Sequence, residues 1–424
     1  MDTLGGKISA DLDFTVMDMG SEALLNNAYS TGLVQSKDRV LTLNDMYYTI
    51  FTSKVDWIQP LKGGKVLEAG LKGSWVESDN NLDLSRGIFN DPFLPDPNSN
   101  RFIYQENVLA AYSSLKGDFS PKLSYHAGLR MEYSDVKGTS KTLNQVNRQE
   151  YVNLFPSVFL QHKISDAYQV VYNVNRRITR PNYRLLNPFV YYIDPLTTEK
   201  GNPNLRPQYS TNLEMDHVIK GVYQFTLGYS VTENSFQQVF EQNEEARSST
   251  LYTANFDKTK NFNFQGVVPF ELVKWWNTSN LVQLNYNKFK SLIGKDLLDI
   301  SQLSYVLRTQ HNFSLPKGFK MELVGTYLGP QIWGMGEVRG FGWVDAGITK
   351  SVMKDKLSLS INGGDLFRTQ WVRASVNFAA IDTRILQYQN EQSVRFTLRY
   401  NFSKGQSFRV NSNSGSSEER KRLD

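Results

Sequence analysis

The chain has 424 residues, too many for one ordinary soluble core and about right for a barrel with loops. Its formal charge of +5 is small for this length and argues against a nucleic-acid partner. The absence of cysteine excludes thiolate metal sites, thiol catalysis and a disulfide framework. No run of about 18 consecutive apolar residues occurs, which excludes membrane-spanning helices.

Period-two alternation recurs along the chain from the first residues to the last. Apolar side chains occupy every second position, with polar ones between them, in segments such as 8–16, 123–133, 223–231 and 394–402. Successive side chains of a strand point to opposite faces, so each segment has one apolar and one polar face. No comparable run has helical spacing, and the pattern predicts an all-β chain.

Alternation alone would also suit a soluble antiparallel sandwich, so the connections decide between the two folds. Short connections are expected near 60–64, 119–122, 164–166, 220–222, 273–275, 316–318 and 353–356. Long ones are expected near 19–40, 78–100, 134–149, 176–206, 234–247, 291–301, 328–340 and 368–392. Short and long connections in strict alternation are typical of an outer-membrane barrel, with its short periplasmic turns and longer outer loops.

The connections predict an antiparallel up-and-down transmembrane β-barrel of about 16 strands, with both ends on the short-turn side. Hairpins around Asn243 and Ala380 keep strand character beyond the membrane and are expected to extend into the medium. A bilayer core offers no water, so every backbone polar group must pair within a sheet that leaves no open edge. Trp275 and Trp276, beside a short turn, fit the aromatic belt of a membrane interface, as does the pair Tyr47 and Tyr48.

Several motifs stand out from the alternating pattern. The most specific is Gly-Asn-Pro-Asn-Leu-Arg-Pro at 201–207, and the others lie at 153–157, 176–183, 186–195, 363–369 and 400–402. Together they resemble the barrel of TonB-dependent receptor-like proteins of the Bacteroidetes type. This resemblance implies localisation in the bacterial outer membrane and a 22-stranded barrel around an N-terminal plug, energised through TonB. It also implies recognition of the terminal strand, with Tyr400 and Phe402, by the barrel-assembly machinery. A surface lipoprotein is a further partner that the resemblance implies.

Compared with that family, the chain is expected to match the last 16 of 22 strands, with the plug, the TonB-contacting segment and a signal peptide missing in front. Residues 1–403 are expected to form the barrel portion, and 404–424 a disordered polar C-terminal tail. TonB would then be engaged only through the missing N-terminal part. The strand at 6–17 and the strand at 393–402 are expected to leave a gapped or partly paired seam.

The proline-rich segment 176–207 carries the candidate substrate-contact residues. They are the side chains of Arg176, Arg177, Arg180, Tyr183, Asn202, Asn204 and Arg206. Guanidinium groups at the outer mouth would hold an anionic substrate or the phosphates of lipopolysaccharide. In the structural alternative, the basic residues, Arg184 included, pair with Asp194 and Glu199 and stabilise the loop.

No cofactor or metal site is expected, since His126, His162, His217 and His311 lie in separate segments without a partner at ligand spacing. An enzyme built from a lumenal histidine and a distant Ser or Asp is the least favoured alternative. The leading hypothesis is the barrel and outer loops of a TonB-dependent receptor or transporter for an unidentified large nutrient. The alternative is a passive porin-like pore, or a structural or surface-binding barrel.

Overall fold

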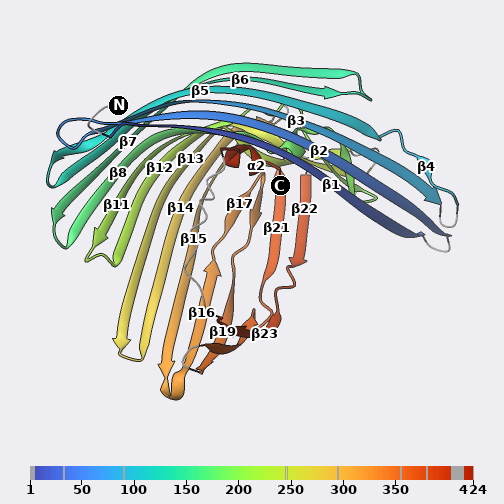
Figure 1. Ribbon diagram of the computed structural model, residues 1–424. Coiled ribbons are helices and arrows are strands. Elements are labelled where there is room, and N and C mark those ends of the chain that lie inside the picture. Colours follow the sequence, from blue (N-terminus) through green and yellow to red (C-terminus); the bar gives the residue numbers. More distant parts are fainter. Residues whose placement is uncertain are drawn as a thin grey trace.

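The computed structural model describes residues 5–31, 34–88, 91–243, 245, 247–293, 296–353, 356–378, 381–402 and 415–423. Nineteen strands form one curved, mostly antiparallel sheet, and four further strands form a small second sheet. Figure 1 shows the large sheet as a trough, with the C-terminal helix α2 on its concave side. The chain is nearly all strand, as the alternation predicts.

Sixteen long strands of the large sheet follow one another as hairpins. They are β1 (Lys7–Thr31), β2 (Val34–Pro60), β3 (Val66–Ile88), β5 (Asn100–Ser120), β6 (Leu123–Ser140), β7 (Gln145–Ser165), β8 (Tyr168–Thr179), β11 (Gln208–Ile219), β12 (Tyr223–Asn243), β13 (Ser248–Val273), β14 (Trp276–Ile293), β15 (Asp296–Leu315), β16 (Phe319–Leu328), β19 (Phe341–Val352), β20 (Leu357–Gly364) and β23 (Ser393–Tyr400). This agrees with the expected number of strands.

The remaining elements are short. The large sheet also contains β4 (Leu94–Pro95), β9 (Val190–Asp194) and β10 (Thr197–Lys200), and the small sheet consists of β17 (Gln331–Trp333), β18 (Gly336–Val338), β21 (Trp371–Phe378) and β22 (Ile381–Tyr388). The helices are α1 (Tyr183–Leu186), α2 (Ser417–Arg420) and the 3-10 turn η1 (Pro316–Gly318). Among the described residues, no helix is long and apolar enough to span a membrane.

The seven short connections lie where the sequence predicts them. They join β2–β3, β5–β6, β7–β8, β11–β12, β13–β14, β15–β16 and β19–β20. Three of the expected long loops, 19–40, 134–149 and 291–301, are instead mostly strand, because the β1–β2, β6–β7 and β14–β15 ladders continue almost to the hairpin tips. The extended hairpins around Asn243 and Ala380 are confirmed by the pairs β12–β13 and β21–β22.

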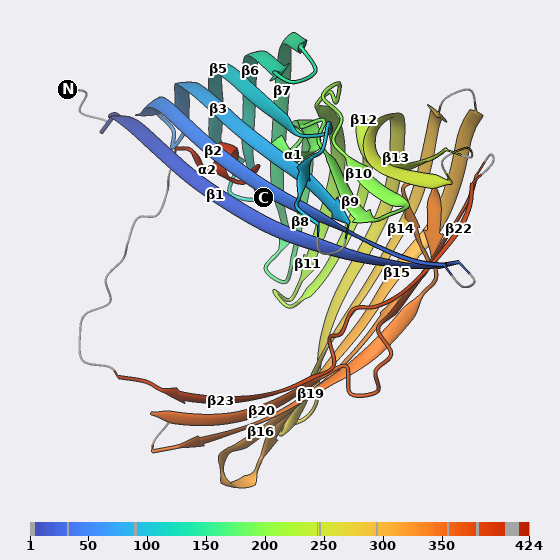
Figure 2. The same ribbon diagram turned by 90° about the vertical axis from the view of Figure 1, so that its right-hand side faces the viewer.

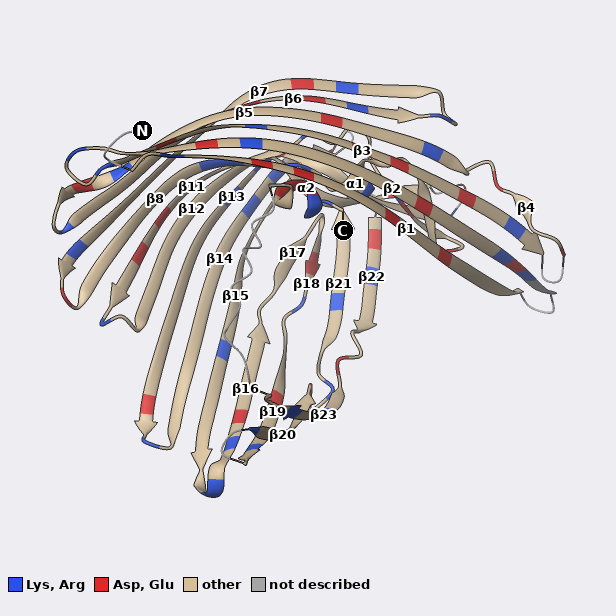
Figure 3. Cartoon of the chain, viewed as in Figure 1, with Lys and Arg blue, Asp and Glu red and all other residues tan. Residues whose placement is uncertain are grey.

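The membrane-spanning part of the strands lies next to the short turns. Residues 223–232 of β12, 261–270 of β13 and 276–287 of β14 contain no charged side chain. Such stretches match the roughly 9–11 residues that a tilted strand needs to cross a bilayer. In Figure 3 these strands run uncharged for much of their length, with charge near their ends. The strands therefore continue well beyond the membrane on the long-loop side.

The two faces of the sheet follow residue parity. Leu227 is opposite Met215 on β11 and Phe264 on β13, so apolar side chains line the convex face that meets lipid. The neighbouring Thr226 donates from Oγ1 to Asp216 Oδ1 at 2.6 Å on the concave face. Phe396 is 75% exposed on the outer face of β23. This register places Leu227 and Phe396, apolar positions of the alternating segments 223–231 and 394–402, on the lipid face.

The sheet is open between its first and last strands. Within the described residues, β1 pairs with β2 alone and β23 with β20 alone. Figure 2 shows β1 and β23 on opposite sides of a wide opening. The gapped seam expected from the sequence is present.

An apolar cluster fills the concave side against β2, β3 and β5. Tyr48, Ile50, Val76 and Tyr104 point inward from these strands, and residues from the segment after β8 cover them. Tyr48 is 2% exposed in mid-strand, so it belongs to this cluster rather than to an interface belt, whereas Tyr47 lies on the outward face. The trough therefore has a packed interior on one side.

The C-terminal residues differ from the expected disordered tail. Residues 415–423 form a turn and the helix α2, and Leu423 is buried in the apolar cluster of the lumen. Residues 403–414 and 424 lie outside the described residues. The polar composition of this segment predicted disorder. The ion-pair partners that order it, Lys72 and Glu106, lie on distant strands of the wall, so composition alone could not reveal them.

Candidate functional site

The segment after β8 folds inward across the trough, and we call residues 180–207 the inner loop. Asn182 caps α1 by accepting a hydrogen bond from Leu185 N at its Oδ1 (2.9 Å). The hairpin β9–β10 follows, and β10 pairs in parallel with β13, which ties the loop to a strand on the far side of β11 and β12. Fixed at both ends, the inner loop is a built part of the lumen.

Apolar residues of the inner loop anchor it to the wall. Tyr183, Leu186, Phe189 and Leu205 are each less than 5% exposed and pack against the inward side chains of β2, β3 and β5. Burial raises the pKa of the Tyr183 hydroxyl. Gly201 permits the fold, because a Cβ there would lie 1.8 Å from the carbonyl oxygen of Asn187.

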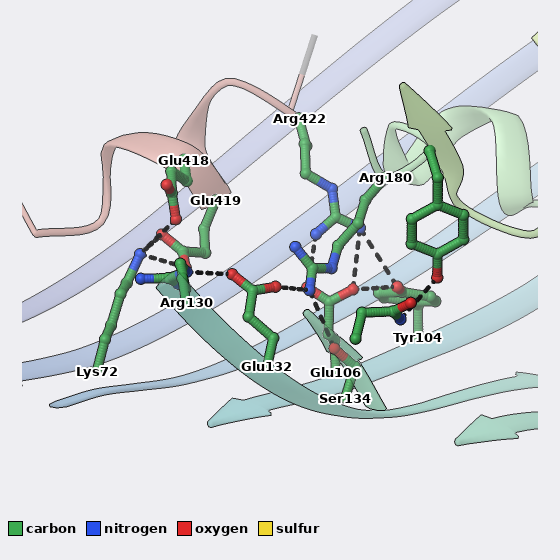
Figure 4. A network of polar contacts seen from close by, with 12 residues as sticks. Lys72, Tyr104, Glu106, Arg130, Glu132, Ser134, Arg180, Glu418, Glu419 and Arg422 are labelled. Carbon is green, nitrogen blue, oxygen red and sulfur yellow. Dashed lines mark hydrogen bonds and ion pairs between the residues drawn. The ribbon is translucent and has the colours of Figure 1, made fainter. Parts of the chain in front are cut away.

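A polar network lies beside this apolar cluster, and Figure 4 shows its members converging from several strands. Arg180 donates from Nη2 to Glu132 Oε2 (2.7 Å) and to Ser134 Oγ (3.0 Å), both on β6. Arg130 holds the other oxygen of Glu132 at 2.5 Å. Burial alone would lower the pKa of Arg180, but Glu106 and Glu132 outweigh it and the pKa is raised. Arg180 is therefore a permanent cation at this position.

The second half of the network involves the C-terminal residues. The guanidinium of Arg422 makes two contacts with Glu106 of β5, Nη1–Oε1 at 2.5 Å and Nη2–Oε2 at 3.1 Å. Tyr104 donates its hydroxyl proton to the same carboxylate at 2.6 Å. Lys72 of β3 pairs with Glu418 at 2.9 Å and with Glu419 at 3.0 Å.

A hollow of about 250 Å³ opens between these groups. Its lining combines cations and carboxylates, chiefly Lys72, Arg130, Arg180, Glu106 and Glu132, with the C-terminal residues on one side. Such a surface can bind polar or zwitterionic groups but offers little to an apolar ligand. No group of three or more His, Asp or Glu side chains close enough to hold a metal occurs in the described part of the chain.

The structure brings only some of the candidate residues from the sequence together. Arg180 and Tyr183 converge at the lumenal network. Arg176 lies apart on β8, where its Nη1 donates to Leu154 O at 3.1 Å and its guanidinium covers the Tyr209 ring. Arg177 is on the opposite, inward face of the same strand, opposite Ser210.

The other three candidates stabilise the end of the inner loop. Asn202 donates from Nδ2 to Thr253 O (3.0 Å) and accepts from Asn204 N at its Oδ1 (3.0 Å). Arg206 donates its backbone N–H to Asn255 Oδ1 at 2.9 Å. The structural alternative holds for Arg184, which pairs with Glu199 at 3.1 Å, whereas Asp194 accepts from Leu196 N.

Sequence reasoning missed the partners contributed by the wall. Glu106, Glu132 and Lys72 are charged residues at inward-facing positions of long strands, buried or nearly so. A buried charge is costly unless it is paired, so a charged residue at an inward-facing position of the sequence pattern indicates a partner nearby. Which charges meet could not be deduced, because strands far apart in sequence supply them.

Comparison with known proteins supports this architecture. The family model of the outer membrane protein beta-barrel family matches residues 1–400. No curated protein shows significant sequence similarity. Among solved structures, the copper transporter OprC aligns with a TM-score of 0.62 at 12% identity, covering 90% of this chain and 64% of that one.

Two further structures show the same fold. The ferripyoverdine receptor of the outer membrane of Pseudomonas aeruginosa has a TM-score of 0.63 at 15% identity, covering 94% of this chain and 54% of that one. The ferric yersiniabactin uptake receptor FyuA from Yersinia pestis has a TM-score of 0.58 at 12% identity, and the alignment covers 93% of this chain and 59% of that one. The chain thus spans about three fifths of the length of these structures.

The predicted outer-membrane β-barrel is confirmed by the family match, and its resemblance to receptor barrels is confirmed for the fold, while the Bacteroidetes type stays a prediction. The apolar convex face, the short turns on one side and the family match all assign the protein to the bacterial outer membrane. This chain belongs to the outer membrane protein beta-barrel family.

Proposed function

We propose that the chain forms the barrel wall and outer loops of a TonB-dependent receptor that imports a large nutrient. The observation that carries the proposal is the inner loop, which leaves the sheet after β8, crosses the concave side and pairs with β13. A wall alone needs no such loop, whereas a receptor needs ordered groups in the path of its ligand.

The ligand would be held by the groups around the hollow. Arg180 lines the hollow and supplies a fixed cation, and Arg177 adds a second cation on the inward face of β8, outside the lining. Guanidinium groups bind carboxylate and phosphate oxygens in a bidentate manner, so we propose an anionic or zwitterionic nutrient. Asn202, Asn204 and Arg206 hold the loop end in place, and Arg176 lies outside the ligand path.

The proposal includes partners and excludes catalysis. TonB is the proposed source of energy, lipopolysaccharide and lipid are the surroundings, and the barrel-assembly machinery and a surface lipoprotein are the proposed protein partners. Within the described part of the chain, Ser134 Oγ accepts from Arg180 and no histidine lines the hollow, so the network offers no activated nucleophile there. We propose that the protein is not an enzyme.

Uptake by cells tests the proposal. Cells expressing the gene would be given radiolabelled ferric citrate or ferripyoverdine, the chelates named for two structurally similar proteins. We expect gene-dependent accumulation of at least one probe, abolished by a proton uncoupler or by loss of TonB. Arg180→Ala should reduce this accumulation, and Arg184→Ala, in the same loop, should not.

The remaining outcomes count against the proposal. Accumulation that persists with the uncoupler would support the passive, porin-like alternative. No gene-dependent accumulation of either probe would overturn the proposal for anionic metal chelates.

A further inference from the structure

The last residues of the chain lie inside the trough, and we call residues 415–423 the C-terminal segment. Gly415 donates its N–H to Asp13 Oδ2 on β1 (2.8 Å), and Tyr183 N of the inner loop donates to Arg422 O (3.3 Å). Between these ends the segment contacts Lys72 on β3 and Glu106 on β5. It thus bridges three wall strands and the inner loop.

Arg422 occupies a pocket that fits a guanidinium group. Besides its two contacts with Glu106, it donates from Nε to Pro181 O (3.0 Å) and from Nη2 to the Tyr104 hydroxyl (3.3 Å). Its guanidinium carbon lies 4.5 Å from the centre of the Tyr183 ring. A planar group with donors on three nitrogens satisfies these contacts together, which a lysine ammonium cannot do.

Most of the pocket is held by contacts that do not involve Arg422. Tyr104 already donates to Glu106, Pro181 belongs to the anchored inner loop, and Arg180 directs its Nη2 to Glu132 and Ser134. With the C-terminal segment in place, Glu106 is 1% exposed. A carboxylate buried to this degree requires a cation, so the wall is prepared for one.

The C-terminal segment is held by side-chain contacts and single hydrogen bonds, as a bound ligand is, and not by the ladder pairing of a strand. It has no ladder pairing with the sheet in the described residues, and its contacts are ion pairs, single hydrogen bonds and the buried side chain of Leu423. These contacts can be broken one after another without breaking any ladder of the sheet. The segment also lines the hollow, so its departure would enlarge the open space beside Arg180.

We propose that the lumen wall carries a binding site for an arginine-bearing peptide, formed by Tyr104, Glu106, Pro181 and Tyr183. The C-terminal segment of this chain is its resident, displaceable ligand. The class of ligand is a short peptide in which an arginine precedes an apolar residue, as Arg422 precedes Leu423. This goes beyond the proposed import function and does not depend on which nutrient is carried.

Disulfide trapping in the full chain tests the position of the segment, because the protein has no cysteine of its own. A Cβ on Gly415 would lie 3.4 Å from Thr52 Oγ1, close enough for a disulfide once the Asp13 carboxylate shifts. Thr52→Cys with Gly415→Cys should therefore crosslink in outer membranes. Phe51→Cys with Gly415→Cys is the matched control and should not, because Phe51 points to the lipid face.

The same crosslink measures the contribution of the arginine. Adding Arg422→Gln should slow disulfide formation about tenfold, since charge-assisted hydrogen bonds to a buried carboxylate are lost. Arg420→Gln removes the same charge from an exposed side chain of α2 and should leave the rate unchanged. Absence of the crosslink, or equal effects of the two substitutions, would overturn the proposal.

Peptide binding tests the site itself. A fluorescent peptide with the sequence of residues 415–424 should bind the full-length Arg422→Gln protein about tenfold more tightly than wild type, whose site is already occupied. Glu106→Gln added to that protein should abolish binding, and a peptide with Gln in place of the arginine should not bind. Equal binding to wild type and Arg422→Gln would overturn the proposal, and this comparison holds even if Glu106→Gln fails to fold.

Discussion

The guanidinium of Arg180 lies 2.7 Å from the carboxylate of Glu132, a residue 48 positions earlier in the chain and on a different hairpin. Both side chains are less than 15% exposed. This pair connects the start of the inner loop to β6 and determines where the loop enters the trough.

Arg180→Ala should destabilise the barrel by about 3–5 kcal/mol, because it leaves the Glu132 carboxylate buried without its partner from the loop. Arg184→Ala is the matched control: its pair with Glu199 is exposed and should contribute less than about 1 kcal/mol. Urea unfolding in lipid vesicles measures both free energies. Similar losses for the two variants would show that the buried pair has no special role.

The face assignment predicts different costs for arginine at adjacent positions. Leu227→Arg places a charge in lipid and should cost about 2–4 kcal/mol near mid-bilayer. Thr226→Arg places it in the lumen beside Asp216 and should cost far less. Folding into vesicles compares the two, and equal losses would contradict the assignment.

The terminal strand should matter for assembly. The rings of Tyr400 and Phe402 are 4.5 Å apart, and Phe402 is 89% exposed, so it stabilises little in the folded sheet. Phe402→Ala should nevertheless lower insertion, if the assembly machinery binds this end. Phe367→Ala, an exposed loop phenylalanine, is the control. Deleting residues 403–424 should leave insertion intact, and the opposite pattern in a membrane-fractionation assay would refute the prediction.

A buried carboxylate stabilises the turn after β20. Asp365 accepts hydrogen bonds from Thr369 N (2.8 Å), Gln370 N (3.2 Å) and the Tyr388 hydroxyl (3.2 Å). Burial alone would raise the pKa of Asp365, but these donors outweigh it and the pKa is lowered. The stabilisation is therefore complete above the unfolded value of about 4 and is lost as the pH falls through the lower, folded pKa.

Hydrogen exchange at Thr369 and Gln370 measures this effect. Asp365→Asn should reduce the protection of both amides at neutral pH. In this variant the protection should no longer decrease further when the pH is lowered. Asp382→Asn, at an exposed position on β22, should change neither. Unchanged protection in Asp365→Asn would mean that the turn is held by other contacts.

Much of the fold is predictable from local chemistry. The lipid and the lumen impose alternation on every strand, and short turns such as 60–64 and 316–318 are marked by glycine and proline. The expected loop 19–40 was wrong because Met19, Leu25 and Val40 continue the ladder beyond the membrane, where polar residues are tolerated on both faces. Strand ends outside the bilayer carry no hydropathy signal.

The site was less predictable than the strands. Arg180 and Tyr183 could be identified because the proline-rich segment is distinctive, but Glu106 and Arg422 could not. Their contact joins positions 316 residues apart through a packing of the inner loop that no local pattern encodes. The placement of the C-terminal segment also depends on a lumen that exists only once the sheet has formed.

The extension of the strands past the bilayer has a consequence for how this protein can vary. Near the short turns a substitution must satisfy hydrocarbon on one side and water on the other, so few residues are acceptable at each position. Beyond the uncharged stretches, the β12–β13 hairpin is held by its ladder and by an apolar cluster in which Val239 and Phe256 are each 1% exposed. Outside that cluster, exposed side chains of the exterior hairpins can therefore change without disturbing either the hairpin or the membrane anchor.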